Sequence, residues 1–155
     1  MKILVTIDFS DITEKVLEQA RRLASAMSGE LCLIHVAEPH PDHIAYDYDP
    51  AAMYAIDPTE IRNNIAHRFQ QEHKTLQKYA DQLRSEGVNC KALMVQGDTV
   101  EVLLKEVEKM AIDFIVVGSH GKGVLSQLLL GSISESLIKK SPVPVYLVPA
   151  DDATS

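Results

Sequence analysis

Two short groups of glycine and hydroxyl residues carry the strongest chemical signal in the sequence. Gly118-Ser119-His120-Gly121 is followed, after nine further residues, by Gly131-Ser132. The first group ends an apolar run at 114–117, and the second precedes a segment with helical periodicity at 133–140. Glycine lets the backbone turn with positive φ and approach a ligand closely, and a helix starting at Ser132 directs unpaired N–H groups and its positive dipole end to the same place. This combination predicts an anion site, most often one for phosphate.

Neither of the two best-known phosphate motifs fits this spacing. A Walker A loop carries Lys-Ser/Thr after its second glycine, whereas Gly123 is followed by Val124-Leu125. A dinucleotide-binding fingerprint follows the first strand, where this chain reads Thr6-Ile7-Asp8-Phe9-Ser10 without a glycine. Tight turns without any ligand also use glycines, so the spacing alone leaves a phosphate site and a plain turn both open.

Length and composition predict one globular domain spanning 1–155. The chain has 155 residues, of which 46% are apolar and 24% charged, enough for one core and too few for two. Its net charge of −7 argues against nucleic acid as a partner, because such binding depends on neutralising phosphates. No stretch has the length of a membrane span, and residues 1–8 have the pattern of a strand and not of a signal peptide. Cys32 and Cys90 lack CxxC spacing and are typical of buried thiols in a reducing compartment, so a cytoplasmic location is expected.

Strand and helix patterns alternate along the chain and predict an α/β fold, a five-stranded parallel sheet with helices on both faces. The strands are expected at 3–7, 31–37, 90–95, 114–117 and 142–148. An aspartate followed three residues later by a glutamate predicts an N-cap at Asp11, Asp57 and Asp98. Helical periodicity is expected to turn certain apolar side chains inward, among them Met27, Ile61, Ile65, Phe69 and Ile138.

Three polar or open segments meet at the carboxyl edge of this predicted sheet, where ligands bind in parallel α/β folds. They are Asp8 after the first strand, Val36-Ala37 after the second, and the glycine loop after the fourth. A long loop at 38–57, rich in proline, tyrosine and aspartate, interrupts the alternation. Loops of this length tend to be functional or mobile, and its tyrosines suit a lid, a partner surface or simple packing equally well.

Taken together, these segments resemble the universal stress protein family over nearly the whole chain. The likeness is carried by Asp8-Phe9-Ser10, His35-Val36, Gly97-Asp98, Gly118-Ser119-His120-Gly121-Lys122-Gly123 with Leu130-Gly131-Ser132, and Pro142-Val143-Pro144-Val145. The family contains members that bind ATP through Gly-x2-Gly-x9-Gly-Ser/Thr and members that lack this motif. The complete motif implies the ATP-binding branch, with Mg²⁺ as the accompanying ion, on a Rossmann-like fold of the adenine nucleotide alpha hydrolase type.

The resemblance also implies a role for each residue at a matching position. Nucleotide contacts are expected from the ends of three strands and from the glycine loop: Thr6, Asp8, Val36, Val117, Gly118, His120, Gly121, Gly131, Ser132 and Ile133. Asp8 would bond the ribose hydroxyls, and the backbone of Val36 would meet the adenine edge. The amides of Gly121, Gly131, Ser132 and Ile133, with the Ser132 hydroxyl, would hold the phosphates beside His120. Thr6 stands where the family often has proline. A threonine at this position keeps the strand and adds a backbone N–H.

Beyond the site, the family implies a homodimer through the strand at 143–148, as its apolar edge also suggests. An unidentified protein partner would sense whether nucleotide is bound and so link it to a stress response.

Other interpretations of the same residues stay open. His120 could act as a general acid, Lys122 could neutralise phosphate, and His35, His40 and His43 with Asp42 could form a metal site of unfamiliar spacing. Ser132 and Ser134 are candidate acceptors of a phosphoryl group from bound ATP. With no nucleophile–base pair visible in the sequence, any ATP hydrolysis is expected to be slow.

Two other classes of protein are weighed against the nucleotide-binding regulator. An enzyme of the adenylyl-transfer or ATP-pyrophosphatase type on the same fold is the main alternative, although Asp8-Phe9-Ser10 stands where a pyrophosphatase needs a Ser-Gly-Gly-type loop. A receiver domain phosphorylated on aspartate needs paired acids after the first strand and an aspartate after the third, where this chain has Asp8 alone and Gln96-Gly97.

Overall fold

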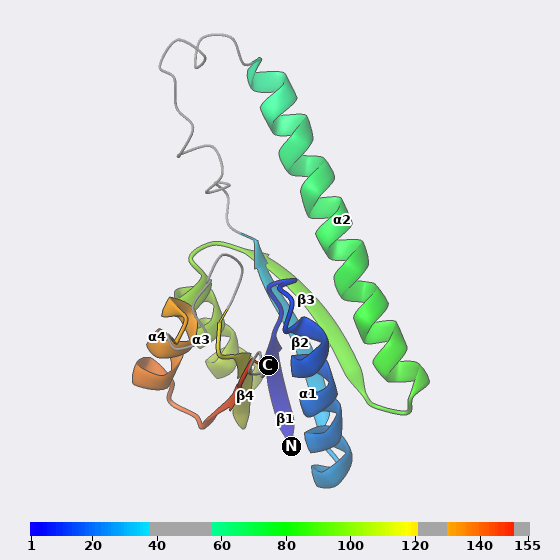
Figure 1. The fold of residues 1–155 in the computed structure, drawn as a ribbon, viewed down its shortest axis with the longest axis vertical. Coiled ribbons are helices and arrows are strands. Elements are labelled where there is room, and N and C mark those ends of the chain that lie inside the picture. The colour runs from blue at the N-terminus through cyan, green and yellow to red at the C-terminus, as the bar shows by residue number, and fades with distance from the viewer. Residues whose placement is uncertain (38–56, 121–129, 151–155) are drawn as a thin grey trace, which may run out of the picture.

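The computed structural model describes residues 1–37, 57–120 and 130–150. Their strands and helices alternate along the chain (Figure 1): β1 Lys2–Thr6, α1 Thr13–Met27, β2 Glu30–Ala37, α2 Pro58–Ser85, β3 Cys90–Gln96, α3 Thr99–Met110, β4 Phe114–Gly118, α4 Ser132–Lys140 and β5 Val145–Val148. All strand pairs are parallel, in the order β3-β2-β1-β4-β5. The expected five-stranded α/β fold is confirmed.

The central strands are apolar on both faces because helices cover both. Ile3, Leu4 and Val5 of β1 are all fully buried, and they alternate between two cores. Ile3 and Val5 pack into a cluster with residues of α1 and α2, whereas Leu4 joins residues of α3 and α4. Figure 1 shows the two helix pairs on opposite sides of the sheet. This arrangement accounts for the continuous apolar runs in the sequence.

Two of the three predicted N-caps form as expected, and the third does not. The Asp57 carboxylate accepts from the Thr59 amide at 2.8 Å, and Asp98 accepts from the Glu101 amide at 3.0 Å. The prediction for Asp11 is wrong. The chain enters α1 through a turn in which the Thr13 amide donates to the Ser10 carbonyl, so the helix begins later, with Ile12 at its N-cap position and no side-chain cap.

Some of the expected inward-facing residues are exposed or only half-buried. Met27 is 45% exposed because α1 ends there and the chain turns at Ser28. Ile138 is 50% exposed because Ser134 and Leu137 occupy the buried face of α4. In α2, the buried positions lie in the second half of the helix, at Leu76, Ala80 and Leu83, and Ile61, Ile65 and Phe69 in its first half are half-buried. Figure 1 shows that this first half extends past the sheet.

Strand β5 begins at Val145, later than the expected 142, since Pro142 and Pro144 have no N–H for a strand ladder. Cys32 and Cys90 are both free and buried. Burial raises the pKa of each thiol to about 11, so both are protonated and unreactive at neutral pH. Within the described ranges, no helix combines the length and apolar character needed to cross a lipid bilayer.

Asp98 caps its helix and Asp11 does not, so the two aspartates should contribute differently to stability. Replacing Asp98 with alanine should lower the free energy of unfolding by about 1 kcal/mol, because the Glu101 amide loses its acceptor. Asp11→Ala should change it by less than about 0.5 kcal/mol, as for other exposed positions. Urea denaturation of both variants measures this, and equal losses would contradict the expected difference between the two aspartates.

Candidate functional site

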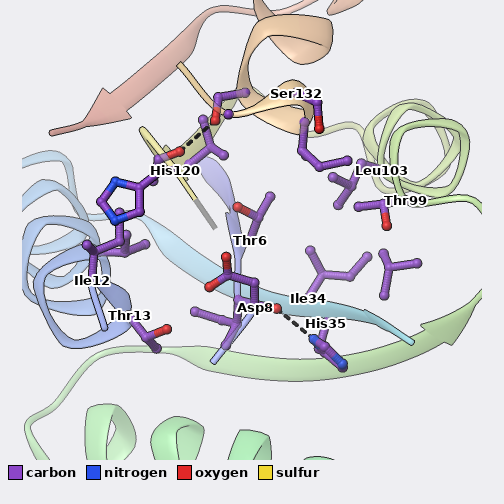
Figure 2. A pocket seen from close by; sticks show the side chains of 18 residues that line it. Thr6, Asp8, Ile12, Thr13, Ile34, His35, Thr99, Leu103, His120 and Ser132 are labelled. Atoms are coloured by element: carbon purple, nitrogen blue, oxygen red, sulfur yellow. Dashed lines mark hydrogen bonds between the residues drawn. The ribbon is translucent and has the colours of Figure 1, made fainter. Parts of the chain in front are cut away.

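A cavity of about 370 Å³ opens at the carboxyl edge of the sheet. It lies where the strand order changes direction, with the end of β1 between the ends of β2 and β4, the place where ligands bind in parallel α/β folds. Of the residues expected at a nucleotide site, those in the described ranges all line this cavity (Figure 2): Thr6, Asp8, Val36, Val117, Gly118, His120, Gly131, Ser132 and Ile133. Gly121 lies outside the described residues, and the ligand roles of all these residues remain predictions.

One end of the cavity is mainly apolar. Figure 2 shows Ile34 of β2 opposite Leu103 of α3 at this end, with Thr99 beside them, and Val36 and Val117 also line the cavity. The prediction missed Ile34, Thr99 and Leu103. A signal for Ile34 was its place just before His35-Val36 in a strand that ends at this edge. The α3 residues carry no local signal, because only the packing of that helix brings them here.

The other end of the cavity is polar. In Figure 2 the Asp8 side chain projects into the middle of the cavity, and its Oδ1 accepts from the Ser10 amide at 3.0 Å. Across from it, α4 begins at Ser132. The first amides of a helix have no acceptor within the helix and carry the positive end of its dipole. The cavity therefore offers an apolar slot, a carboxylate and an anion-attracting helix start.

The turn after β4 owes its shape to two glycines. A Cβ on Gly118 would lie 2.4 Å from Ile12 Cδ1, and one on Gly131 would lie 3.2 Å from His120 Cα. Neither glycine has positive φ; among the described glycines only Gly87 and Gly97 do. The expected positive φ is therefore wrong at Gly118 and Gly131, and what these two positions require is the close approach of neighbouring segments.

Backbone groups of this turn are paired within the protein. The Gly131 amide donates to the Ser119 carbonyl at 2.8 Å, so in this structure the amide expected to hold phosphate is used by the turn itself. Ser134 Oγ donates to the Gly118 carbonyl at 2.8 Å, and Ser134 is only 3% exposed. Ser134 is thus a structural hydroxyl, and its candidacy as a phosphoryl acceptor is not supported.

His120 has an acidic neighbour that the sequence did not indicate. Its Nε2 lies 3.4 Å from Asp11 Oδ1, at the entrance to α1, and its Nδ1 lies 3.5 Å from Ser119 Oγ. Ser119 Oγ accepts from the Ala150 amide at 3.0 Å, which leaves the hydroxyl proton available to Nδ1. The ring is held from two sides at the polar end of the cavity, where a nucleotide contact is expected from it.

The suggested metal site around His35 falls mostly outside the described residues, and only His35 itself can be placed. His35 Nδ1 is 2.7 Å from the Ile7 carbonyl oxygen, and Nε2 is 3.3 Å from Glu72 Oε2. His40, His43 and Asp42 lie outside the described ranges, as do Lys122 and most of the loop at 38–57. No group of three metal-binding side chains comes together in residues 1–37, 57–120 and 130–150.

Comparison with known proteins identifies the family. The model of the universal stress protein family matches residues 1–149. The chain is 30% identical over 152 residues to universal stress protein MJ0577 of Methanocaldococcus jannaschii, covering 95% of this chain and 93% of that protein. The solved structure of MJ0577 matches with a TM-score of 0.75 at 29% identity, over 98% of this chain and 97% of that one. The chain belongs to the universal stress protein family.

Two further solved structures share the fold at lower identity. One is a universal stress protein family protein from Arabidopsis thaliana with AMP bound, at a TM-score of 0.66 and 20% identity over 97% of this chain and 92% of that one. The other is a universal stress protein in complex with cAMP, at a TM-score of 0.63 and 21% identity over 97% and 98% of the two chains. Both contain an adenine nucleotide.

The contact between Gly118 and Ile12 predicts a coupled pair of substitutions. Gly118→Ala should lower the free energy of unfolding by about 1–3 kcal/mol, because the new methyl group meets buried Ile12. Ile12→Val, which removes the nearest carbon, should cost about 0.5–1.5 kcal/mol alone and much less in the Gly118→Ala background. Chemical denaturation of the four proteins gives the coupling free energy, expected near 1 kcal/mol. Additive effects would contradict the close approach.

Proposed function

We propose that this protein binds an adenine nucleotide, ATP above all, in the cavity at the carboxyl edge of its sheet. The observation that carries the proposal is that one cavity combines three kinds of surface. Its lining contains apolar side chains such as Ile34, Val36 and Leu103, the Asp8 carboxylate and the start of α4 at Ser132. Base, ribose and phosphates of a nucleotide need these three kinds of surface.

Each part of the site suits the corresponding part of the ligand. The slot accepts a flat base, and the Val36 backbone at the end of β2 can pair with its edge. A carboxylate such as Asp8 can accept from both ribose hydroxyls. The amides of Ser132 and Ile133, with the Ser132 hydroxyl and the helix dipole, attract phosphate. The predicted Gly121 amide would add to them.

The size of the cavity and the relatives support the same class of ligand. A volume of about 370 Å³ lies within the range of about 300–1,000 Å³ usual for small-molecule pockets. AMP and cAMP are bound in two proteins of the same fold. ATP is preferred here because the chain carries the complete glycine motif. Mg²⁺ would accompany it through the phosphates, since this ion binds mainly through them and water and needs no cage of protein ligands.

The bound nucleotide would act as a signal, with little turnover. His120 lies between Asp11 and the Ser119 hydroxyl, and little turnover is expected because the Ala150 amide holds Ser119 Oγ as part of the turn. Nucleotide binding would favour one arrangement of the surrounding loops, and a protein partner would bind that arrangement in a stress response. The unpaired buried thiols fit a reducing, cytosolic setting.

A homodimer through β5 is part of the same proposal. This strand lies at the edge of the sheet, and Tyr146 on it is 41% exposed. An apolar edge strand of this kind is a natural surface for pairing with another chain.

The nucleotide proposal predicts which variants lose binding. ATP should be released when the purified protein is denatured, and calorimetry should show binding of added ATP. Asp8→Asn should weaken binding by roughly 10–100-fold, as expected for lost bonds to a charged acceptor. Gly131→Val should abolish it, because its side chain would press on His120 and Ser119.

Asp98→Asn is the matched control for Asp8→Asn. Asp98 follows β3 at the same edge, lies outside the cavity lining, and is replaced by a residue that caps helices equally well. It should bind ATP like the unsubstituted protein. Protein that carries no nucleotide and takes up neither ATP, ADP nor AMP would refute the proposal, and pyrophosphate release in turnover assays would instead favour the adenylyl-transfer alternative.

A further inference from the structure

A single buried imidazole contacts both neighbours of Asp8. His35 lies in β2 and is 8% exposed. Its Nδ1 is 2.7 Å from the carbonyl oxygen of Ile7, and its ring centroid is 4.6 Å from that of Phe9. Ile7 and Phe9 are the residues on either side of Asp8, the carboxylate proposed to bind ribose. The turn that presents Asp8 to the cavity is therefore held by His35 on both sides.

This turn needs such support, because its backbone is unfavourable without it. Phe9 has φ of 56°, in the left-handed region that residues other than glycine seldom adopt. Ser10 Oγ, two residues after Asp8, is buried without a hydrogen-bond partner. Strained backbone of this kind persists only where the surroundings enforce it. Asp8 is itself exposed, and its carboxylate accepts from the Ser10 amide of the same turn, so its position depends on what holds this turn at residues 7 and 9.

The hydrogen bonds of His35 connect the turn to α2. The Ile7 carbonyl can only accept, so Nδ1 carries a proton and donates to it. The other ring nitrogen, Nε2, lies 3.3 Å from Glu72 Oε2 in α2. Both nitrogens are thus used by protein atoms, and His35 acts on a ligand through Asp8.

Neighbours along α2 hold Glu72 and Phe9 in turn. Glu72 Oε1 is 3.8 Å from Arg68 Nε, and the Arg68 guanidinium carbon lies 5.1 Å from the centre of the Phe69 ring. The Tyr79 ring is stacked on Phe9 at 6.5 Å. Two separate contacts, one through His35 and one through Phe9, therefore link α2 to the turn that carries Asp8.

We propose that His35 is the positioning residue for Asp8, and that Glu72 of α2 orients His35 for this task. Recognition of the ribose diol then depends on a helix that forms no part of the cavity lining. The inference rests on the proposed nucleotide binding and adds to it a specific determinant of ribose affinity.

The test compares AMP with 2′,3′-dideoxyadenosine monophosphate, which lacks both ribose hydroxyls, by calorimetry. The unsubstituted protein should bind AMP roughly 10–100-fold more tightly, as expected for bonds to a charged acceptor. His35→Leu fills the same space with an apolar side chain and removes the hydrogen-bond donor. In this variant the ratio of the two affinities should fall close to one, while the affinity for the dideoxy compound changes less than about twofold, within the usual error of additivity.

Further variants separate positioning from general stability. His35→Asn places an N–H near the former Nδ1 and should restore part of the ratio, and Glu72→Leu should lose part of it. Leu83→Ala, a buried change on the same helix, is the control for lost stability and should leave the ratio unchanged. In the Asp8→Ala background, His35→Leu should have no further effect on the ratio.

The outcomes distinguish this inference from the proposed function. If His35→Leu and Glu72→Leu keep the full ratio, or lose affinity for both compounds equally, His35 does not position Asp8 and the inference is wrong while nucleotide binding stands. If His35→Leu does not fold, the same ratio of affinities measured for His35→Asn and Glu72→Leu tests the inference. If the unsubstituted protein binds neither compound, the nucleotide proposal itself fails, and the inference with it.

Discussion

The architecture of the site depends on the absence of a side chain at residue 118. The end of β4 passes so close to Ile12, at the entrance to α1, that even one methyl group would lie 2.4 Å from its Cδ1. Because of this approach, the chain after β4 can bring His120 beside Asp11 and still return to start α4 at the cavity. A side chain at this point would press on Ile12 and so on the entrance to α1.

Hydrogen bonds then hold the close approach in place. The carbonyls of Gly118 and Ser119 accept from Ser134 Oγ and from the Gly131 amide, and the Ser119 amide donates to the Val148 carbonyl. Buried polar groups are costly unless they are paired, so these bonds favour one conformation of the turn. A parallel arrangement holds on the other side of the cavity, where His35 pairs with the Ile7 carbonyl. Both polar walls are thus held by hydrogen bonds within the protein, which would reduce the ordering that ligand binding requires.

Some local patterns in the sequence correspond to the structure and others do not. The apolar runs predicted the parallel sheet correctly, because a strand covered on both faces is apolar at every position and does not alternate with polar residues. The caps at Asp57 and Asp98 were right, since each lies directly before its helix. The same pattern failed at Asp11, where the turn from residue 8 displaces the start of α1 and the carboxylate faces His120 instead. The predictions that Met27 and Ile138 face inward were wrong, because periodicity does not show where a helix ends or which neighbouring residue takes the buried position.

The sequence by itself determined the fold class, the edge of the sheet that carries the cavity, and half of the described residues that line it. These follow from local rules, since strand ends and glycines can be located by their neighbours in the chain. Only the tertiary structure decided that Gly118 and Gly131 serve close approach and not positive φ. It also decided that Thr99 and Leu103 form a wall of the cavity, and that His35 meets Glu72. Such contacts join residues far apart in the chain, and their geometry is set by how helices pack on the sheet, which no local pattern records.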